Sequence, residues 1–191
     1  LAAAQAVLAG CIQAIEVAMT TPGALHVIQE ATAQFGQKVV FGAGSVLDPE
    51  TASACVLAGA QFIVCPTVNI RTIQFCNRYS IPVLPGAYTP TEILTAWEAG
   101  ASVVKIFPAS LGGPGYIKAV KAPLPQVRMA AVGGVTVENT ADFFRAGVVM
   151  VGVGGELVNQ QLLDNHDFDE ITARAQKFRS QVLLVRQERG S

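Results

Sequence analysis

The chain has 191 residues and a formal net charge of −1; 51% of its residues are hydrophobic and only 14% are charged. This composition excludes intrinsic disorder, and the near-zero net charge argues against a nucleic-acid-binding protein, which would present a basic face to phosphates. The length is typical of one domain with a sizeable core, and no uncharged apolar run reaches the roughly 18 residues of a membrane-spanning helix.

Short apolar runs alternate with longer, Ala-rich amphipathic segments. Strands are predicted at 14–19, 39–44, 61–65, 82–85, 102–107, 127–132 and 148–153. Helices are predicted at 1–9, 26–35, 49–57, 70–78, 90–98, 116–120, 137–146 and 169–185, with a frayed tail at 187–191. Ala-Gly pairs end three of these helices, at Gly59, Gly100 and Gly147, where glycine adopts a left-handed conformation at little cost.

Strand–helix alternation at this spacing indicates parallel βαβ units. Seven predicted strands follow the first helix, so one further strand before Leu1 would complete a (β/α)8 TIM barrel. We therefore expect residues 1–191 to form a single α/β domain, a (β/α)8 barrel that lacks its first strand in this chain. The alternative is an open doubly wound sheet, which normally carries a Gly-rich fingerprint after its first strand; none is present here.

Histidine and cysteine, the usual ligands of structural zinc, are few and scattered in this chain. The two histidines, His26 and His166, stand alone, and no two cysteines are closer than ten residues. This spacing argues against a zinc site. The cysteines are expected to be reduced and mostly buried, which is typical of a cytoplasmic protein and leaves an organellar location open: Cys11, Cys55, Cys65 and Cys76.

A lysine lies in the middle of the apolar strand predicted at 102–107. Lys is almost never buried without a partner, and strand alternation places Lys105 on the same face as Phe107. If that face is the barrel interior, loss of water lowers the pKa of the amine, and a neutral amine can attack a carbonyl to form a Schiff base. The alternative is an edge-strand lysine that reaches solvent.

A glutamate lies in the strand predicted at 14–19. Glu16 shares one face with two alanines, while the bulky side chains on the other face suit packing against outer helices. In a complete barrel Glu16 lies on the second strand and Lys105 on the sixth, and alternate strands contribute to the same interior layer. The two residues together suit imine chemistry with proton transfer, and a structural ion pair is the alternative.

Glycine pairs follow the last two predicted strands. Gly133 and Gly134 come after the strand at 127–132, and Gly154 and Gly155 come after the strand at 148–153. Glycines let backbone N–H groups approach an anion, and phosphate sites in barrels often form from the loops after strands seven and eight. The sequence therefore predicts a phosphate site, with tight turns alone as the alternative.

The loops after two earlier strands carry further candidates. Ser45 ends the run Gly42-Ala43-Gly44-Ser45 and can offer a hydroxyl at the barrel mouth. Asp48 is expected to cap the following helix, with Pro49 at its first position. The pair Cys65-Pro66 ends the next strand in a similar way.

Together these residues resemble the 2-keto-3-deoxy-6-phosphogluconate (KDPG) and 4-hydroxy-2-oxoglutarate (KHG) aldolase family over essentially the whole chain. The motifs that carry the resemblance occur in order: Ile15-Glu16-Val17, Gly42-Ala43-Gly44-Ser45-Val46-Leu47, Lys105-Ile106-Phe107-Pro108 and Val132-Gly133-Gly134-Val135. The run Gly113-Pro114-Gly115-Tyr116-Ile117-Lys118-Ala119 also resembles the family, including its branch that acts on the galactonate epimer.

The resemblance implies a class I aldolase, often a homotrimer, that cleaves a 2-keto-3-deoxy-6-phospho sugar acid to pyruvate and glyceraldehyde 3-phosphate. It implies no metal or other cofactor, and no nucleic-acid or membrane partner is expected. It assigns the Schiff-base amine to Lys105 and the proton shuttle to Glu16. It places Ser45 near the substrate carboxylate, lines the pocket with Pro66 and Phe107, and assigns phosphate binding to Gly133, Gly134, Gly154 and Gly155.

Two positions depart from the family pattern. Thr20 stands where many members carry an Arg that contacts the substrate carboxylate, and Arg71 is a candidate substitute. Val132 stands where many relatives have Thr, which removes one hydroxyl donor. Three other functions stay open: KHG cleavage, a non-catalytic aldolase-like barrel that serves as a binding or assembly subunit, and another phosphate-binding barrel enzyme that uses Lys105 only as a charge.

Overall fold

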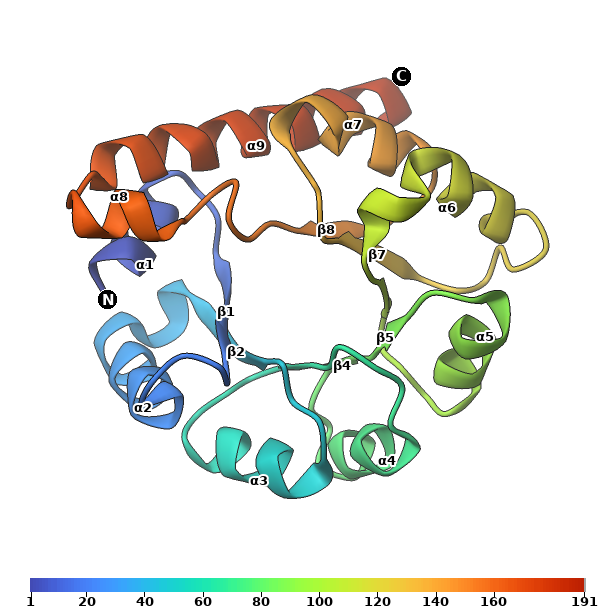
Figure 1. The fold of residues 1–191 in the computed structure, drawn as a ribbon, viewed down its shortest axis with the longest axis horizontal. Coiled ribbons are helices and arrows are strands. Elements are labelled where there is room, and N and C mark those ends of the chain that lie inside the picture. The colour runs from blue at the N-terminus through green and yellow to red at the C-terminus, as the bar shows by residue number, and fades with distance from the viewer. Residues whose placement is uncertain (191) are drawn as a thin grey trace. The chain divides into compact units, whose positions relative to one another are not determined.

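The structure, a computed structural model, describes residues 1–190, with side chains through Glu188 (Figure 1). The strands are β1 Ala14–Ala18, β2 Val40–Gly44, β3 Ile63–Val64, β4 Val83–Leu84, β5 Gly86–Ala87, β6 Val104–Ile106, β7 Met129–Val132 and β8 Met150–Gly152. The α-helices are α1 Ala2–Ala9, α2 Ala24–Phe35, α3 Pro49–Leu57, α4 Ile70–Arg78, α5 Pro90–Glu98, α6 Gly113–Lys121, α7 Val137–Arg145, α8 Gln160–Asp164 and α9 Phe168–Gly190. The 3-10 helices are η1 Gly36–Lys38 and η2 Ala109–Leu111. No helix among the described residues is both long and apolar enough to cross a membrane.

The chain divides into two compact units. The β1–β6 unit consists of Ala14–Phe107 and Gln126–Arg128. The β7–β8 unit consists of Leu1–Gln13, Pro108–Pro125 and the chain from Met129 onward. In the first of these, β1, β2, β3 and β4 pair in parallel in chain order. Parallel pairing of consecutive strands joined by helices confirms the predicted βαβ organisation.

The strand predicted at 82–85 is observed as β4, and a further short strand that was not predicted, β5, follows Pro85. Pro85 separates β4 from β5, because proline has no N–H to donate to a strand ladder. Strand β5 then pairs in parallel with β6, with Gly86 opposite Lys105. The residue beside Lys105 on β5 therefore has no side chain.

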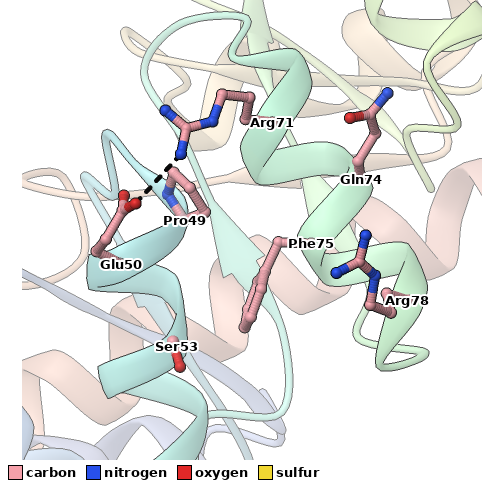
Figure 2. A pocket seen from close by; sticks show the side chains of 7 residues that line it. All are labelled: Pro49, Glu50, Ser53, Arg71, Gln74, Phe75 and Arg78. Atoms are coloured by element: carbon pink, nitrogen blue, oxygen red, sulfur yellow. Dashed lines mark hydrogen bonds and ion pairs between the residues drawn. The ribbon is translucent and has the colours of Figure 1, made fainter.

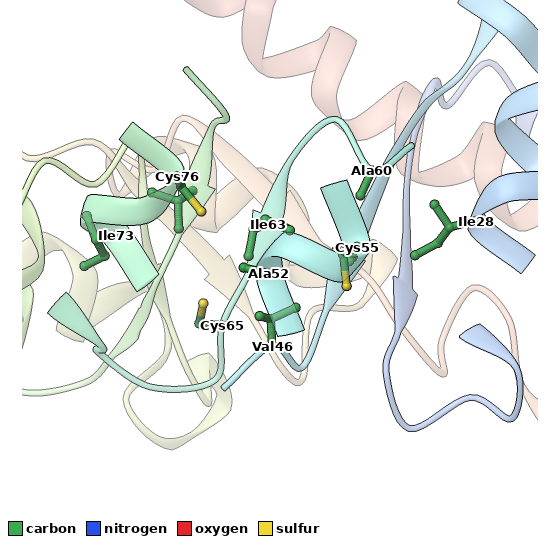
Figure 3. Close-up of a cluster of buried hydrophobic side chains, with 11 residues drawn as sticks. Ile28, Val46, Ala52, Cys55, Ala60, Ile63, Cys65, Ile73 and Cys76 are labelled. Atoms are coloured by element: carbon green, nitrogen blue, oxygen red, sulfur yellow. The ribbon is translucent and has the colours of Figure 1, made fainter. Parts of the chain in front are cut away.

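The core of the β1–β6 unit is a cluster of fully buried side chains between the strands and their helices (Figure 3). Ile63 on β3 is buried beside Cys55 on α3 and Ile73 on α4. Burying an Ile side chain contributes about 1.5–3 kcal/mol. Val17 on β1 and Met19 directly after it pack against this cluster, which confirms that the bulky face of that segment turns towards the helices.

Side-chain caps define where the helices of this unit begin. Asp48 Oδ1 accepts a hydrogen bond from the Thr51 N–H at 2.6 Å, with Pro49 in the first turn, as predicted. Thr89 and Glu92 form a capping box at the start of α5. Such caps satisfy N–H groups that have no partner within the helix.

In the β7–β8 unit, α1 and α7 pack against the long helix α9 (Figure 1). The Thr172 hydroxyl donates a hydrogen bond to the Ala6 carbonyl at 3.0 Å. A side chain at Gly10 would overlap Ala175, so glycine allows α1 and α9 to approach closely. Strands β7 and β8 pair in parallel, with Val132 opposite Gly152.

Several boundaries differ from the sequence prediction. Helix α8 was not predicted, because its five residues are too few to show a periodic pattern. The predicted frayed tail is wrong for 187–190, where α9 continues, and Ser191 lies outside the described residues. The single domain with a further strand before Leu1 stays a prediction.

Candidate active site

Lys105 is held in the middle of β6 by backbone pairing. Its N–H donates to the Pro85 carbonyl at 2.9 Å, and the Phe107 N–H donates to Ala87 at 3.1 Å. Only 7% of Lys105 is exposed, which contradicts the alternative of a lysine that reaches solvent. Its Nζ lies 4.7 Å from the centre of the Phe107 ring, which confirms that the two residues share a face.

The surroundings of Lys105 favour a neutral amine. Burial lowers the pKa of Lys105 below its usual 10.5, and the nearby Glu16 and Cys65 oppose this shift. Because removal from water dominates, the amine loses its proton more readily than a lysine on the surface. The neutral amine is the form required for attack on a carbonyl carbon, and a lowered pKa makes that form more accessible.

Glu16 projects from β1 at a position that pairs with Gly42 on β2. Burial raises the pKa of Glu16 above its usual 4.5, while the charge of Lys105 lowers it. The residue as a whole is exposed, so the raised pKa comes from the protein atoms around the carboxyl group and not from complete removal from water. A carboxyl group with a raised pKa holds its proton more readily than one in open water.

The two groups act on each other through their charges. Each alters the pKa of the other, yet the direct ion pairs of the described residues do not include Glu16 with Lys105. This arrangement does not match the alternative of a structural ion pair, which would need direct contact. The structure brings a buried amine and a carboxyl group into one local site.

Cys65 belongs to the same site, although sequence reasoning gave it no role. It lies directly after β3, is 1% exposed, and its N–H donates to the Leu84 carbonyl at 3.0 Å. Burial, followed by the neighbouring Cys76, raises the pKa of the Cys65 thiol to about 12. The thiol therefore stays uncharged beside Lys105. Its position next to Pro66 at a strand end was the one available sequence signal.

The remaining candidates in this unit lie on the loops after β2, β3 and β6. Ser45 is half-buried and has a φ of 58°, a left-handed conformation that is uncommon for a residue with a side chain. The Pro66 carbonyl lies so close to Gly86 that any side chain there would overlap it. Phe107 is 39% exposed beside the Lys105 amine. Phe107 thus lies beside Lys105, Pro66 lies near it through Gly86, and the binding roles of all three residues stay predictions.

Arg71, the candidate substitute for a carboxylate-binding arginine, has another partner. Its guanidinium lies 3.3 Å from Glu50 Oε1, and both side chains are exposed. Figure 2 shows this pair in a groove between α3 and α4, together with Phe75 and Arg78. None of the predicted site residues lines that groove. We therefore assign Arg71 no role in the site.

The glycine pairs lie in the β7–β8 unit. Gly133 and Gly134, after β7, have φ values of 88° and 75°, which glycine adopts far more readily than other residues. The Gly133 carbonyl accepts a hydrogen bond from the Ser110 N–H at 2.9 Å. A side chain at Gly134 would overlap Ser110, a neighbour that the sequence did not reveal because 24 positions separate the two residues along the chain.

Gly154 and Gly155 form an exposed turn after β8. The Gly154 carbonyl accepts hydrogen bonds from the N–H groups of Leu157 at 2.9 Å and Val158 at 3.0 Å. From α9, Arg174 donates to the Glu156 carbonyl at 3.1 Å. Since β7 and β8 pair in parallel, both glycine loops follow neighbouring strands at the same end.

Comparisons with known proteins show similarity to one family. The family model for KDPG and KHG aldolase matches residues 1–174. The chain is 42% identical over 153 residues to the 2-dehydro-3-deoxy-6-phosphogalactonate aldolase of Escherichia coli (strain K12), covering 80% of this chain and 75% of that protein. It is 37% identical over 175 residues to the 2-dehydro-3-deoxy-phosphogluconate aldolase of Treponema pallidum (strain Nichols), covering 91% and 83%.

Solved structures show the same fold. A structure described as native KDPGal has a TM-score of 0.91 at 36% identity, covering 97% of this chain and 89% of that one. KDPG aldolase from Legionella pneumophila, with pyruvate captured at low pH as a covalent carbinolamine intermediate, has a TM-score of 0.86 at 29% identity, covering 92% and 85%. The predicted (β/α)8 fold class is confirmed by these matches, and the chain belongs to the KDPG and KHG aldolase family.

Proposed function

We propose that this protein is a class I aldolase that cleaves a 2-keto-3-deoxy-6-phospho sugar acid to pyruvate and glyceraldehyde 3-phosphate. The observation that carries the proposal is a buried Lys105 whose pKa is lowered beside Glu16, in a member of an aldolase family. The galactonate and gluconate epimers are the substrates named for its two relatives above.

The reaction begins at Lys105 Nζ. The neutral amine adds to the C2 ketone, the former carbonyl oxygen leaves as water, and an iminium forms. The C4 hydroxyl gives its proton to the Glu16 carboxylate while the electrons of the C3–C4 bond move into the iminium. Glyceraldehyde 3-phosphate leaves, and the enamine takes a proton at C3. Hydrolysis then releases pyruvate and restores the amine.

The other predicted residues would bind the substrate rather than react. Ser45 is proposed to face the substrate carboxylate, and Pro66 and Phe107 to line the pocket. The loops with Gly133, Gly134, Gly154 and Gly155 are proposed to bind the 6-phosphate through backbone N–H groups. The positive φ values at Gly133 and Gly134 and the exposure of the turn after β8 support this role.

Trapping with pyruvate and borohydride tests the proposal. Borohydride reduces an imine to a stable amine, so mass spectrometry should find a pyruvyl adduct on the peptide that contains Lys105. A Lys105→Met variant should form no adduct, whereas Lys118→Met, which changes an exposed lysine on α6, should react like the wild type. An adduct on the Lys105→Met protein would overturn the assignment of the amine.

KHG cleavage is the second candidate, because the matching family model includes KHG aldolase. It would use the same imine and release glyoxylate instead of glyceraldehyde 3-phosphate. Turnover of each substrate by one preparation distinguishes the two activities. Imine trapping without turnover of any 2-oxo acid would favour the non-catalytic alternative.

The proposal extends to a homotrimer in the cytoplasm. One structural relative, with a TM-score of 0.91 at 35% identity, is a cube-shaped cage designed by fusing symmetric oligomeric domains. Exposed apolar side chains at Leu47 and Ile70 lie close together on the β1–β6 unit, where Asn69 donates a hydrogen bond to the Leu47 carbonyl at 3.0 Å. Light scattering coupled to size-exclusion chromatography measures the mass of the particle in solution, which should be three times that of one chain if the protein is a homotrimer.

A further inference from the structure

Strand β2 ends in Gly42-Ala43-Gly44, directly beside the strand that carries Glu16. The parallel register places Glu16 opposite Gly42, and Ala18 opposite Gly44. Residues opposite each other in this register project from the same face of the sheet. Two positions without side chains therefore stand next to the glutamate.

The space at Gly44 is occupied by the glutamate itself. A Cβ atom added to Gly44 would overlap the Glu16 carboxyl group, and it would lie 2.6 Å from Glu16 Cγ. Real Cβ atoms almost never lie so close to another heavy atom. If Gly44 became alanine, the carboxyl end of Glu16 would have to move, because a flexible side chain shifts more readily than the backbone of β2.

The backbone does not require glycine at this position. Gly44 lies within the extended strand β2 and is not among the residues with positive φ. Alanine can adopt this conformation without strain. The absence of a side chain at Gly44 therefore matters for space and not for conformational freedom.

We propose that Gly44 is a positioning residue, whose missing side chain leaves the volume in which the Glu16 carboxyl group is held for proton transfer. This inference rests on the proposed function, in which Glu16 exchanges protons with the substrate. A general base must lie within hydrogen-bond reach of its proton, and a displacement near 1 Å can reduce a rate by about 100-fold.

Gly42 provides a matched control on the same strand. The three atoms nearest to a Cβ atom at Gly42 all belong to the ring of Phe62, which that Cβ would overlap. Gly42→Ala should therefore disturb packing and lower the melting temperature. It should leave the pH dependence of the remaining activity as in the wild type, because the carboxyl group is not displaced.

The central experiment compares Gly44→Ala with the wild type. We expect kcat for cleavage to fall roughly 10- to 100-fold, with an altered pH profile. Pyruvate trapping by borohydride should persist, because Lys105 is unchanged. An unchanged kcat and pH profile in a folded Gly44→Ala protein would overturn the proposal.

Shortening the glutamate supplies a second test. Glu16→Asp removes one carbon and retracts the carboxyl group, so Gly44→Ala should reduce kcat much less in the Glu16→Asp background than in the wild type.

The melting temperature gives a readout without catalysis: Gly44→Ala should lower it when Glu16 is present, and much less in the Glu16→Ala background. Equal effects in both backgrounds would contradict the inference.

Failure of the proposed function has a different signature. If the wild type neither forms the pyruvyl adduct nor cleaves substrate, then the aldolase assignment fails. The dependence of the Gly44→Ala melting temperature on Glu16 would still test the shared space between the two residues.

Discussion

Lys105 and Glu16 project as long side chains from hydrogen-bonded strands, whereas the glycine pairs after β7 and β8 present backbone on turns. In the first region, strand register sets where the two side chains lie, and removal of water shifts the pKa values of both groups. The second depends on turn geometry, seen in the positive φ values at Gly133 and Gly134. Substitutions in the first region should therefore change the chemical step, and those in the second should change binding.

The largest effect is expected for Lys105→Arg. Arginine keeps a positive charge but does not deprotonate near neutral pH, so it cannot form an imine. Cleavage should fall by about 10³-fold or more, the scale seen when an essential nucleophile is removed. Steady-state kinetics with pyruvate release as the readout measures the loss. Retained activity would mean that Lys105 acts only as a charge, as in the alternative of another phosphate-binding enzyme.

Glu16→Gln should rank second. Loss of a positioned acid–base group costs roughly 10²-fold in rate. Because burial raises the pKa of Glu16, its ionisation should give the wild-type kcat/KM profile an acid limb above pH 4.5, and the variant should lack that limb. A wild-type pH profile in the Glu16→Gln protein would assign the proton transfer to another group.

The same variant tests the pKa shift through stability. A carboxyl group whose folded pKa is raised binds its proton more tightly in the folded state than in the unfolded state. Its ionisation therefore costs stability as the pH rises through the window from 4.5 to the folded pKa. Thermal melts should show Glu16→Gln to be more stable than the wild type at pH 7, with the difference disappearing below pH 4.5. A variant that is less stable at pH 7 contradicts the shift.

Gly134→Ala should weaken binding of the 6-phosphate group of the substrate. The left-handed backbone costs a residue with a side chain about 1–2 kcal/mol, and the new methyl group would also meet Ser110. We expect KM to rise about 10-fold for the 6-phosphorylated substrate, with pyruvate trapping unchanged. Gly115→Ala, at an open position in α6, is the matched control. Equal KM changes for phosphorylated and unphosphorylated substrates would remove the phosphate assignment.

The smallest effect is expected for Arg174→Met. The Arg174 guanidinium donates a hydrogen bond to the Glu156 carbonyl at 3.1 Å and forms an ion pair with Glu170 at 2.8 Å. These contacts tie the loop after β8 to α9. Removal of the guanidinium should raise KM for the phosphorylated substrate by about 3-fold, because a hydrogen bond to a partly exposed charged group contributes little more than 0.5 kcal/mol. Arg179→Met, an exposed residue on the same helix, should leave KM unchanged. A shift in kcat without a shift in KM would contradict this role.

Local signals explain the elements that were predicted well. The predicted helices at 49–57, 70–78 and 90–98 agree with the bounds of α3, α4 and α5. Each begins after a capping side chain and ends near an Ala-Gly pair or a short turn, and these are interactions between residues close in sequence. Strand alternation likewise predicted correctly that Lys105 and Phe107 share a face.

Contacts between distant residues could not be predicted in this way. Cys65 lies beside Lys105, the carboxyl group of Glu16 fills the space over Gly44, and Ser110 packs against Gly134. In each case the partners come from different segments, and their distance depends on strand pairing and loop paths. The sequence shows that Gly42 and Gly44 alternate along one strand, but it does not show which side chain fills the space over Gly44.

By itself, the sequence determined the strand–helix order, the capped helices and the identity of the two charged residues on apolar strands. These features follow from residue periodicity and backbone preference, which act over a few positions. Tertiary structure alone decided that water is withdrawn from Lys105, that Cys65 stays a neutral thiol next to it, and that Glu16 lies over Gly44. Desolvation and close packing depend on every neighbour in space, so they emerge only when the strands are paired and the helices are packed against them.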